Sequence, residues 1–375
     1  MKSAYQAIAQ GYFRQRDFPA SALYSRKHLK QHPDDAQGWI NLGKTLTSTA
    51  EFACAEHALL EGIRLSDKAE YYLDLQVLYA LTNNDEKRKA VREILEERIP
   101  DEPRFIYNKA WDKIKAGDTY GGWADLEVGR YVDAFGSIFT HWPEKRLTDL
   151  SQIEGNRIAI AGEGGLGDEI IGARYAPIIR ELGGTPILIC RDQLHSILGH
   201  LAECRSHDDK GVIDYYVPTL GAVPVFKQIP NEVYLSAKAG YVEKHSKAVS
   251  SDKIKVGICW HGNTDYEWEQ CRTVSKEMLY GLESDDVDVF SLQQDDTDLD
   301  LSTWEDTLGV IANLDMVISS CTAVVHAAGA MGKRVLVLVP YAAYYMWTTK
   351  EKWYADVTTV PRSTTPKELE EWIHA

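Results

Sequence analysis

Hydrophobic residues recur along the first third of the chain at the three- and four-residue spacing of amphipathic helices. Residues 1–135 hold few runs of β-branched residues, so this periodicity predicts helices rather than strands. A self-comparison at a spacing of 34 residues aligns Tyr5 with Trp39 and Tyr12 with Leu46. A repeat of that length predicts stacked helix pairs, each burying its apolar face against the next.

The clearest copy of the repeat is WINLGKTL at 39–46. It fits the tetratricopeptide pattern W-x2-L-G-x2-Y, with Leu46 in the last place. We expect Trp39 and Leu42 to fill the space between paired helices and Gly43 to permit their close approach. Residues 1–135 are therefore predicted to form a tetratricopeptide-like helical domain, which either only supports the rest or offers a concave surface to an acceptor or partner.

From residue 156 short apolar strands alternate with amphipathic helices. A first series is predicted at 157–161, 186–190 and 215–217, and a second at 256–260, 287–291, 316–319 and 335–339. The Lys- and Ser-rich stretch 236–252 between them is expected to be a linker. Buried strands alternating with helices indicate parallel sheets covered on both faces. The prediction is an α/β fold with two Rossmann-like domains, 150–250 and 251–375.

The residues that follow each strand are the candidates for a site, because ligands in such folds bind at the carboxyl ends of the strands. After the first strand comes GEGGLGD, residues 162–168. Gly165 and Gly167 would let the backbone approach a ligand, and the next helix would offer its first amides. The spacing is not the G-x-G-x-x-G of dinucleotide sites. Asp168 is expected to be a helix N-cap or, in a cleft that faces an acceptor, a general base.

The second strand series offers a different set of groups. Arg272 follows the first of these strands and could neutralise a diphosphate with its fork of donors. The turn 319–323 opens a helix of small residues, and the free amides near Ala323 would suit a pyrophosphate. His326 lies one turn further and by itself is expected to be a packed core histidine. The acidic loop 294–300 is interpreted as solvated surface rather than a metal site.

Composition narrows the classes of function. With 41 basic and 56 acidic residues the net charge is −15, which argues against a protein that coats nucleic acid. Residues 1–48 carry seven Lys or Arg against three Asp, so a local basic groove remains compatible. The six cysteines form no C-x-x-C pair and are expected to be reduced, buried thiols without a structural metal. No apolar stretch of membrane-spanning length and no signal sequence is present, which predicts a cytoplasmic protein.

In combination, the motifs resemble the tetratricopeptide-repeat glycosyltransferases of bacteria and phages, a family of GT-B type related to the ADP-heptose heptosyltransferases. The resemblance covers nearly the whole chain. The segments that carry it, in chain order, are GGWADLE at 121–127, GLGD at 165–168 with ARY at 173–175, WHGN at 260–263, SLQ at 291–293, DT at 306–307, LDMVI at 314–318, TAVVHAAGA at 322–330, YYMW at 344–347 and WY at 353–354.

This resemblance implies a transferase that moves a sugar from a nucleotide-diphosphate sugar to an acceptor hydroxyl, with inversion and without metal or other cofactor. Asp168 would be the general base, and Arg272, Thr322 and the amides near Ala323 would hold the diphosphate. The remaining residues that the resemblance places at the donor site are Gly165, Gly167, Trp260, His261, Gly262, Asn263, Gln293, Asp306, Cys321, His326, Tyr344 and Trp347. The acceptor would be a glycan, a protein or modified DNA.

Two departures from the family pattern support alternative functions. Cys321 stands where the family has Asp before the threonine of the phosphate-binding turn, and Glu163-Gly164 replaces the usual E-Q before G-L-G-D. One alternative is a non-catalytic interaction scaffold with a degenerate transferase domain. The other is a phage-type glycosyltransferase that acts on modified DNA bases, for which the basic first 48 residues, with Tyr5, Tyr12 and Phe13, could supply a groove.

Overall fold

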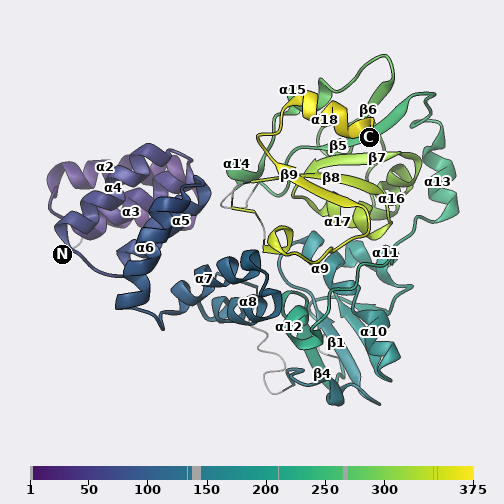
Figure 1. Ribbon diagram of the computed structural model, residues 1–375, viewed down its shortest axis with the longest axis horizontal. Helices are drawn as coiled ribbons and strands as arrows, with labels where there is room; N and C mark the ends of the chain where they lie inside the picture. Colours follow the sequence, from purple (N-terminus) through teal and green to yellow (C-terminus); the bar gives the residue numbers. More distant parts are fainter. Residues whose placement is uncertain are drawn as a thin grey trace. The chain divides into compact units, whose positions relative to one another are not determined.

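The computed structural model describes residues 3–132, 134–136, 145–209, 211–264, 269–340, 342–343 and 345–375. The chain separates into two compact units. The first unit contains Met1–Asn108, Asn263–Thr273 and Pro340–Ala343. The second unit contains Lys109–Gly262, Val274–Val339 and Tyr344–Ala375 (Figure 1).

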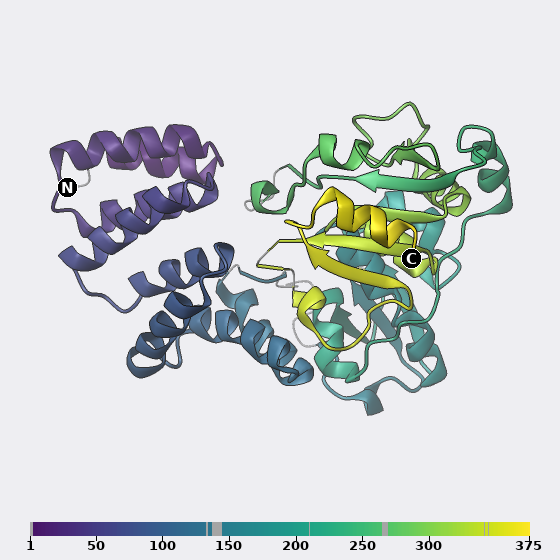
Figure 2. The ribbon, with the colours of Figure 1, turned by 45° about the horizontal axis from the view of Figure 1, so that its top comes forward.

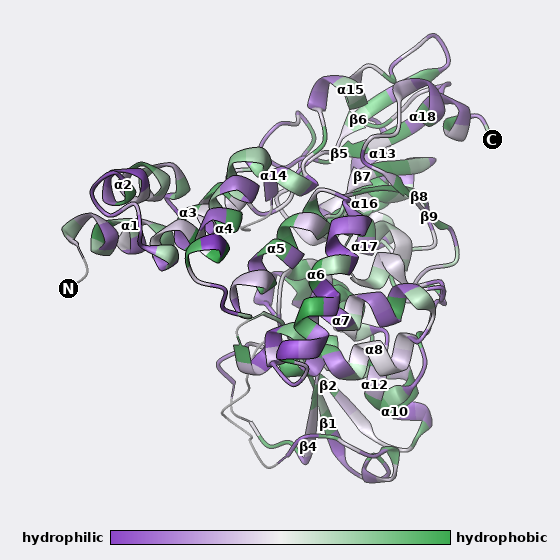
Figure 3. Cartoon of the chain, turned by 60° about the vertical axis from the view of Figure 1, so that its left-hand side comes forward, coloured by the Kyte–Doolittle hydropathy of each residue, from purple (hydrophilic) through white to green (hydrophobic). Residues whose placement is uncertain are grey.

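The first unit is built from antiparallel helices, as the periodicity predicts. They are α1 (Ala4–Arg14), α2 (Phe18–Gln31), α3 (Ala36–Ser48), α4 (Phe52–Leu65), α5 (Tyr71–Leu81) and α6 (Asp85–Arg98), and α7 (Pro103–Ala116) leads into the second unit. Side chains cap the starts of α1, α2 and α6. Ser3, Asp17 and Asn84 each accept a hydrogen bond from a backbone amide in the first turn of the helix that follows. Hydrophilic residues, in purple, and hydrophobic residues, in green, both occur along these helices (Figure 3).

Small residues let these helices approach closely. An ideal Cβ on Gly43 would lie 2.6 Å from the Leu59 side chain, which confirms the role predicted for that glycine. Leu42 is buried in the same core. Trp39 is only half-buried, and its indole donates to the Pro33 carbonyl at 2.8 Å.

The second unit begins with α8 (Thr119–Leu126) and the 3-10 helix η1 (Glu127–Val132), followed by a parallel sheet in the order β3-β2-β1-β4. Its strands are β1 (Arg157–Ala161), β2 (Thr185–Ile189), β3 (Glu203–Arg205) and β4 (Tyr215–Pro218). The associated helices are α9 (Leu166–Ala173), α10 (Ala176–Glu181), α11 (His195–Leu198) and α12 (Ala222–Phe226), with short 3-10 turns η2 (Leu150–Gln152), η3 (Asp192–Leu194) and η4 (Thr219–Gly221).

A second parallel sheet follows in the order β6-β5-β7-β8-β9. Its strands are β5 (Ile254–Cys259), β6 (Val287–Ser291), β7 (Met316–Ser320), β8 (Arg334–Val339) and β9 (Val357–Pro361). The helices around it are α13 (Ala239–Ser246), α15 (Lys276–Tyr280), α16 (Trp304–Asn313), α17 (Ala323–Ala330), η5 (Tyr345–Thr348) and α18 (Pro366–Ile373). Leu369 and Ile373 of α18 share one core with strand residues such as Ile258 and Ile318, and Figure 2 shows α18 in yellow beside β9.

The predicted fold class is confirmed: helical repeats precede two parallel α/β sheets. Three details of the prediction were wrong. The expected linker 236–252 contains helix α13, which is docked on α16 by hydrogen bonds from Lys244 and His245 to Asp306. The edge strands β3 and β9 were missed, because β3 has only three residues and two exposed threonines break the apolar run of β9. Cys54 is exposed rather than buried, although all six cysteines are free thiols.

No helix in the described part of the chain is both long and apolar enough to cross a bilayer.

Candidate functional site

Each sheet has a place where the strand order reverses, and the predicted site residues follow those strands. In the first sheet the reversal lies between β1 and β4, and in the second between β5 and β7. The register aligns Ala161 with Pro218 and Cys259 with Ser319. Ligands of open parallel sheets bind at such points, outside the carboxyl ends of the strands. The turns after β1, β5 and β7 therefore form the candidate site.

The glycine-rich turn after β1 leads into α9 and positions Asp168. Asp168 is the third residue of α9, not its N-cap as one interpretation predicted; Gly165 holds the N-cap position. Its Oδ2 accepts a hydrogen bond from the Gly165 amide at 2.7 Å. Gly164 has φ of +72°, and a Cβ there would lie 2.4 Å from Asp168 Oδ2. A glycine at 164 is thus required by both the backbone conformation and the carboxylate.

A buried cluster of ion pairs stabilises the turn after β1. The Glu163 side chain is fully buried and accepts from Arg130, at 2.8 Å for Nη2, and from the Leu220 amide at 2.9 Å. Burial by itself would lower the pKa of Arg130, but its bonds to Glu163 and Glu127 raise that pKa above its ordinary value. Burial would likewise raise the pKa of Glu127, but Arg130 and Arg146 outweigh it and lower that pKa. These charges fix the turn.

A second buried carboxylate holds the other side of the same turn. Glu169, next to Asp168, accepts from the Arg191 amide at 2.9 Å and from His207 Nε2 at 2.9 Å. The Arg191 guanidinium also contacts Glu169 and donates to the Gly164 carbonyl at 2.8 Å. Sequence reasoning missed Glu163, Glu169 and their partners. The only available signal was an acidic residue beside the apolar run of α9. The sequence does not show which positively charged residue pairs with it.

The segment from the end of β7 to the start of α17, residues 319–323, has no comparable charges. Ser319 Oγ donates to the Ser320 carbonyl at 2.8 Å and lies 3.1 Å from Thr322 Oγ1. Thr322 is the N-cap of α17, and its side chain accepts no hydrogen bond from a first-turn amide. Cys321 is buried. The first amides of α17 thus lack a side-chain cap, which is the condition under which a helix start binds an anion.

The first turns of α9 and α17 lie against each other between the two sheets (Figure 1). A Cβ on Gly167 would lie 2.6 Å from His326 Cδ2 and 3.4 Å from Ala323 Cα. The absence of a side chain at 167 is what allows this approach. The structure therefore brings the first turn of α9, which contains Gly167 and Asp168, against Ala323 and His326 of α17.

Aromatic side chains hold His326 in place. Its Nδ1 lies 3.0 Å from the Tyr354 hydroxyl, and its ring is stacked on Trp347 at 5.4 Å between centroids. Burial raises the pKa of the Tyr354 phenol well above its ordinary value, so the hydroxyl keeps its proton. His326 is buried, as predicted for a packed histidine, and it also borders the α9 turn. Arg174, fully buried, donates to the Trp353 carbonyl at 2.7 Å and lies 4.6 Å from the Tyr354 ring centroid.

At the ends of β5 and β6 the predicted residues bond to one another. Gln293 Oε1 accepts from the His261 amide at 3.3 Å, and Gln293 Nε2 donates to Asp295 at 3.0 Å. That hydrogen bond lowers the pKa of Asp295. The His261 ring donates to the Gly262 carbonyl at 2.9 Å. Trp260 is buried in the core of the sheet.

The other predicted residues have separate positions. Asn263 and Arg272 belong to the segment Asn263–Thr273 of the first unit, where Arg272 ends α14 (Glu269–Arg272) and its Nε donates to Glu269 at 2.8 Å. Asp306 is buried and bonded to Lys244, His245 and Thr303, which makes it an anchor between α13 and α16. Tyr344 lies outside the described residues.

Within the described part of the chain, no group of three or more His, Cys, Asp or Glu side chains could hold a metal ion. The acidic loop that follows β6 is engaged in ion pairs, with Asp296 bonded to Lys276 and Asp300 to Lys244.

Comparisons with solved structures give a likeness at the level of the fold. No known protein family matches the sequence, and no curated protein matches it either. Among solved structures, a mutant of the O-GlcNAc transferase of Thermobaculum terrenum is similar, with a TM-score of 0.40 and 14% sequence identity. The alignment covers 99% of this chain and 88% of that one.

Proposed function

We propose that this chain is a glycosyltransferase of GT-B type that moves a sugar from a nucleotide-diphosphate sugar to an acceptor hydroxyl. One observation carries the proposal. The helix starts that follow the switch-point strands of two parallel sheets meet at Gly167 and Ala323. One start supplies a carboxylate, Asp168, and the other supplies amides without a side-chain cap. A base beside an anion site is what sugar transfer from a diphosphate requires.

In the proposed reaction the donor diphosphate binds at the first turn of α17, where backbone amides and the helix dipole favour negative charge. Asp168 accepts the proton of the acceptor hydroxyl as its oxygen attacks the anomeric carbon. The new carbon–oxygen bond forms on the face opposite the diphosphate, and the bond to the phosphate oxygen breaks, so the configuration inverts. The α17 amides would stabilise the charge that the leaving diphosphate gains, a role that the family resemblance also gives to Arg272, and the scheme uses no metal ion.

The first test is calorimetric binding of a panel of nucleoside diphosphates, nucleoside monophosphates and nucleotide sugars. The proposal expects binding that requires the diphosphate and that weakens in Arg272→Ala more than in Arg272→Lys. Asp168→Asn should bind the donor normally and lose transfer activity by a factor on the order of 10² to 10⁴. If the entire panel fails to bind wild-type protein, the proposal is wrong.

One observation favours a second candidate, a non-catalytic scaffold. Cys321 is buried in the turn that would meet the diphosphate, where the resembling family has Asp. The panel separates the two candidates, since a scaffold would bind none of the nucleotides. If the protein is a scaffold, the Cys321→Asp variant should also bind none of the nucleotides.

A further inference from the structure

The two ring nitrogens of His326 have different surroundings. Nδ1 lies 3.0 Å from the hydroxyl of Tyr354 in the interior of the protein. The opposite edge of the ring faces the first turn of α9, since an ideal Cβ on Gly167 would lie 2.6 Å from Cδ2 and 3.3 Å from Nε2. Asp168, the proposed base, directly follows Gly167. Which nitrogen carries the proton therefore decides what the ring offers at the candidate site.

The hydroxyl of Tyr354 is positioned to donate to this ring. Burial raises the pKa of the Tyr354 phenol well above its ordinary value, so the proton stays on its oxygen. The neighbouring hydroxyl of Tyr234 donates to the Ile170 carbonyl at 3.0 Å, and a phenol oxygen is a weaker base than an imidazole nitrogen. The proton of Tyr354 is thus directed at Nδ1 of His326, which leaves the proton of a neutral ring on Nε2.

A buried cation favours the neutral form of the ring. Arg174 is fully buried, and its Cζ lies 4.6 Å from the centroid of the Tyr354 ring. Its guanidinium donates to backbone carbonyls, at 3.1 Å to Ile171 and at 2.7 Å to Pro230, and carbonyl partners do not cancel its charge. An imidazolium in the same buried cluster would be disfavoured by desolvation and by repulsion from this like charge. We therefore treat His326 as a neutral imidazole with a single N–H.

Trp347 fixes the plane of the His326 ring and adds a second N–H to its surroundings. The two rings are almost parallel, with an interplanar angle of 4° and 5.4 Å between their centroids. Nε1 of Trp347 is buried and has no hydrogen-bond partner among the described residues. A buried donor without an acceptor is costly. An excess of hydrogen-bond donors suits a ligand that is rich in acceptor oxygens, as a diphosphate is.

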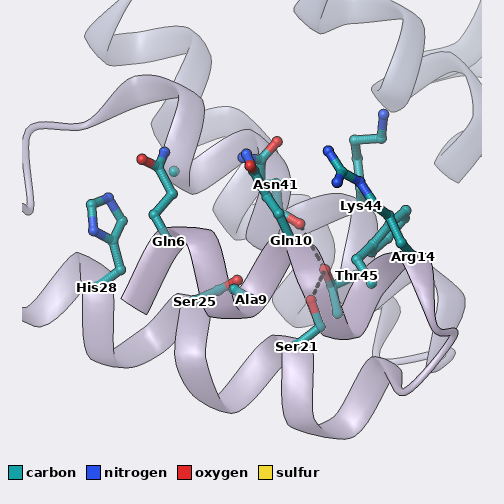
Figure 4. A pocket seen from close by; sticks show the side chains of 12 residues that line it. Gln6, Ala9, Gln10, Arg14, Ser21, Ser25, His28, Asn41, Lys44 and Thr45 are labelled. Atoms are coloured by element: carbon teal, nitrogen blue, oxygen red, sulfur yellow. Dashed lines mark hydrogen bonds between the residues drawn. The ribbon is translucent and has the colours of Figure 1, made fainter. Parts of the chain in front are cut away.

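Another buried histidine, His28 of the helical unit, has a carboxylate as its partner. Figure 4 shows His28 beside Gln6 at one end of a groove among α1, α2 and α3. Its Nε2 lies 2.7 Å from Oδ2 of Asp35. Burial by itself would raise the pKa of Asp35, but its bonds to His28 and to backbone amides outweigh burial and lower that pKa. Because its partners differ from those of His326, His28 is an internal reference for the measurement described below.

We propose that Tyr354 is a positioning residue that holds His326 in the Nε2–H tautomer, so that the ring offers a hydrogen bond to the diphosphate of the sugar donor. The inference rests on the proposed transferase function. In the other tautomer the lone pair of Nε2 would face the phosphate oxygens and repel them. With Nε2 protonated, the hydrogen bond strengthens as the leaving diphosphate gains charge. Tyr354 acts through His326 and contacts neither substrate.

The first test is a long-range proton–nitrogen NMR spectrum of the full chain with isotopically labelled histidine, which distinguishes the two tautomers and the imidazolium. The variant His326→Gln assigns the signals. We expect the Nε2–H tautomer for His326 in wild type at neutral pH. Tyr354→Phe should move the Nδ1 signal of His326, because the hydrogen bond is lost, and should leave the His28 signals in place. An Nδ1–H tautomer or an imidazolium in wild type would overturn the proposal without any variant.

The second test is calorimetric binding of ADP, GDP, CDP and UDP. Tyr354→Phe should weaken the tightest of them by about three- to tenfold, the size of one hydrogen bond. The matched control is Tyr234→Phe, which removes a hydroxyl that bonds to Ile170 instead and should change the affinity by less than about twofold.

The outcomes separate this inference from the proposed function. Full affinity in Tyr354→Phe, or an equal loss in Tyr234→Phe, would overturn the role of Tyr354 and leave the transferase function standing. If wild type binds none of the four diphosphates, the proposed function is wrong, and the diphosphate as the ligand of His326 is wrong with it. Melting temperatures of both variants check that each protein is folded under the conditions of the assay.

Discussion

The two strand-to-helix turns at the candidate site are held in place by opposite means. The turn after β1 is held by buried charges, with Glu163 bonded to Arg130 and Glu169 to Arg191. The turn after β7 contains only Ser, Cys, Thr and Ala, held by short hydroxyl hydrogen bonds. Each turn leads into a helix, α9 or α17, and the first turns of those helices touch.

This difference follows from what each turn has to present. The first turn positions a carboxylate, Asp168, and the ion pairs beneath it hold a glycine-rich backbone that would otherwise be mobile. The second turn presents helix amides that the Thr322 side chain does not cap, as the proposed phosphate contact requires. Of the two turns, only the one that carries Asp168 is held by buried charges.

The largest effect is expected from removing Arg130, the cation that pairs with Glu163 in the turn after β1. Arg130→Met should lower the free energy of unfolding by about 3–5 kcal/mol, since it leaves Glu163 charged and buried without its partner. Urea denaturation measures this. Arg26→Ala removes an exposed pair with Glu51 and should cost at most about 1 kcal/mol. Similar losses in the two variants would show that buried charge does not stabilise the first turn.

A glycine substitution tests the contact between the turns. Gly167→Ala should destabilise by about 1–3 kcal/mol, because its methyl would overlap His326 and the helices must separate. The matched control is Gly11→Ala in α1, where nothing lies within 4 Å of the added methyl. That change should stabilise by about 0.5–1 kcal/mol through helix propensity. A neutral Gly167→Ala variant in thermal and urea melts would contradict the close contact.

Acidic pH should reduce the stability that Glu127 contributes to the turn after β1. The pKa of Glu127 is lowered in the folded state because the hydrogen bonds from Arg130 and Arg146 outweigh the effect of burial. A carboxylate whose pKa is lower in the folded than in the unfolded state stabilises the protein at pH values above its unfolded pKa of about 4.3. That stabilisation is lost as the pH falls through the pKa of the folded state. The stability difference between wild type and Glu127→Gln should therefore be constant above about pH 5.5 and shrink in more acidic solution. A difference that grows on acidification would contradict this assignment.

The smallest effects are expected in the neutral turn. Ser320 Oγ is buried without a hydrogen-bond partner among the described residues, so Ser320→Ala should be neutral or stabilise by up to about 1 kcal/mol. Ser319→Ala removes a hydroxyl that bonds to the Ser320 carbonyl and lies close to Thr322 and should destabilise by about 1–2 kcal/mol. Calorimetric melting of the pair measures both, and a larger loss at 320 than at 319 would reverse the assignment.

Local pattern was sufficient for most elements of the fold. Periodicity predicted the helical repeat, and apolar runs predicted β1, β2, β4 and the strands β5 to β8. The prediction failed where tertiary contacts overrode local sequence. The polar residues of α13 form a helix because Lys244 and His245 meet Asp306, a partner some 60 residues away along the chain.

For the candidate site, too, some residues could be predicted from local sequence and others could not. Gly165, Gly167, Asp168, Thr322 and Ala323 were identified from their positions after strands, and the structure places them at the switch points. The role of Asp306 as an anchor of α13 was not visible, because its partners are distant in sequence. Arg174 gave no signal as a fully buried cation, since two of the backbone carbonyls that it meets belong to the distant residues Pro230 and Trp353.

The sequence by itself determined where most helices and strands form and which residues follow those strands, because these depend on the periodicity of neighbouring side chains. Only the tertiary structure decided that Arg130 meets Glu163, that Tyr354 holds His326 and that Gly167 lies against the start of α17. Such pairings join residues 28 to 156 positions apart. They depend on the crossing of whole helices, whose geometry is fixed by packing across the domain rather than by any local stretch of chain.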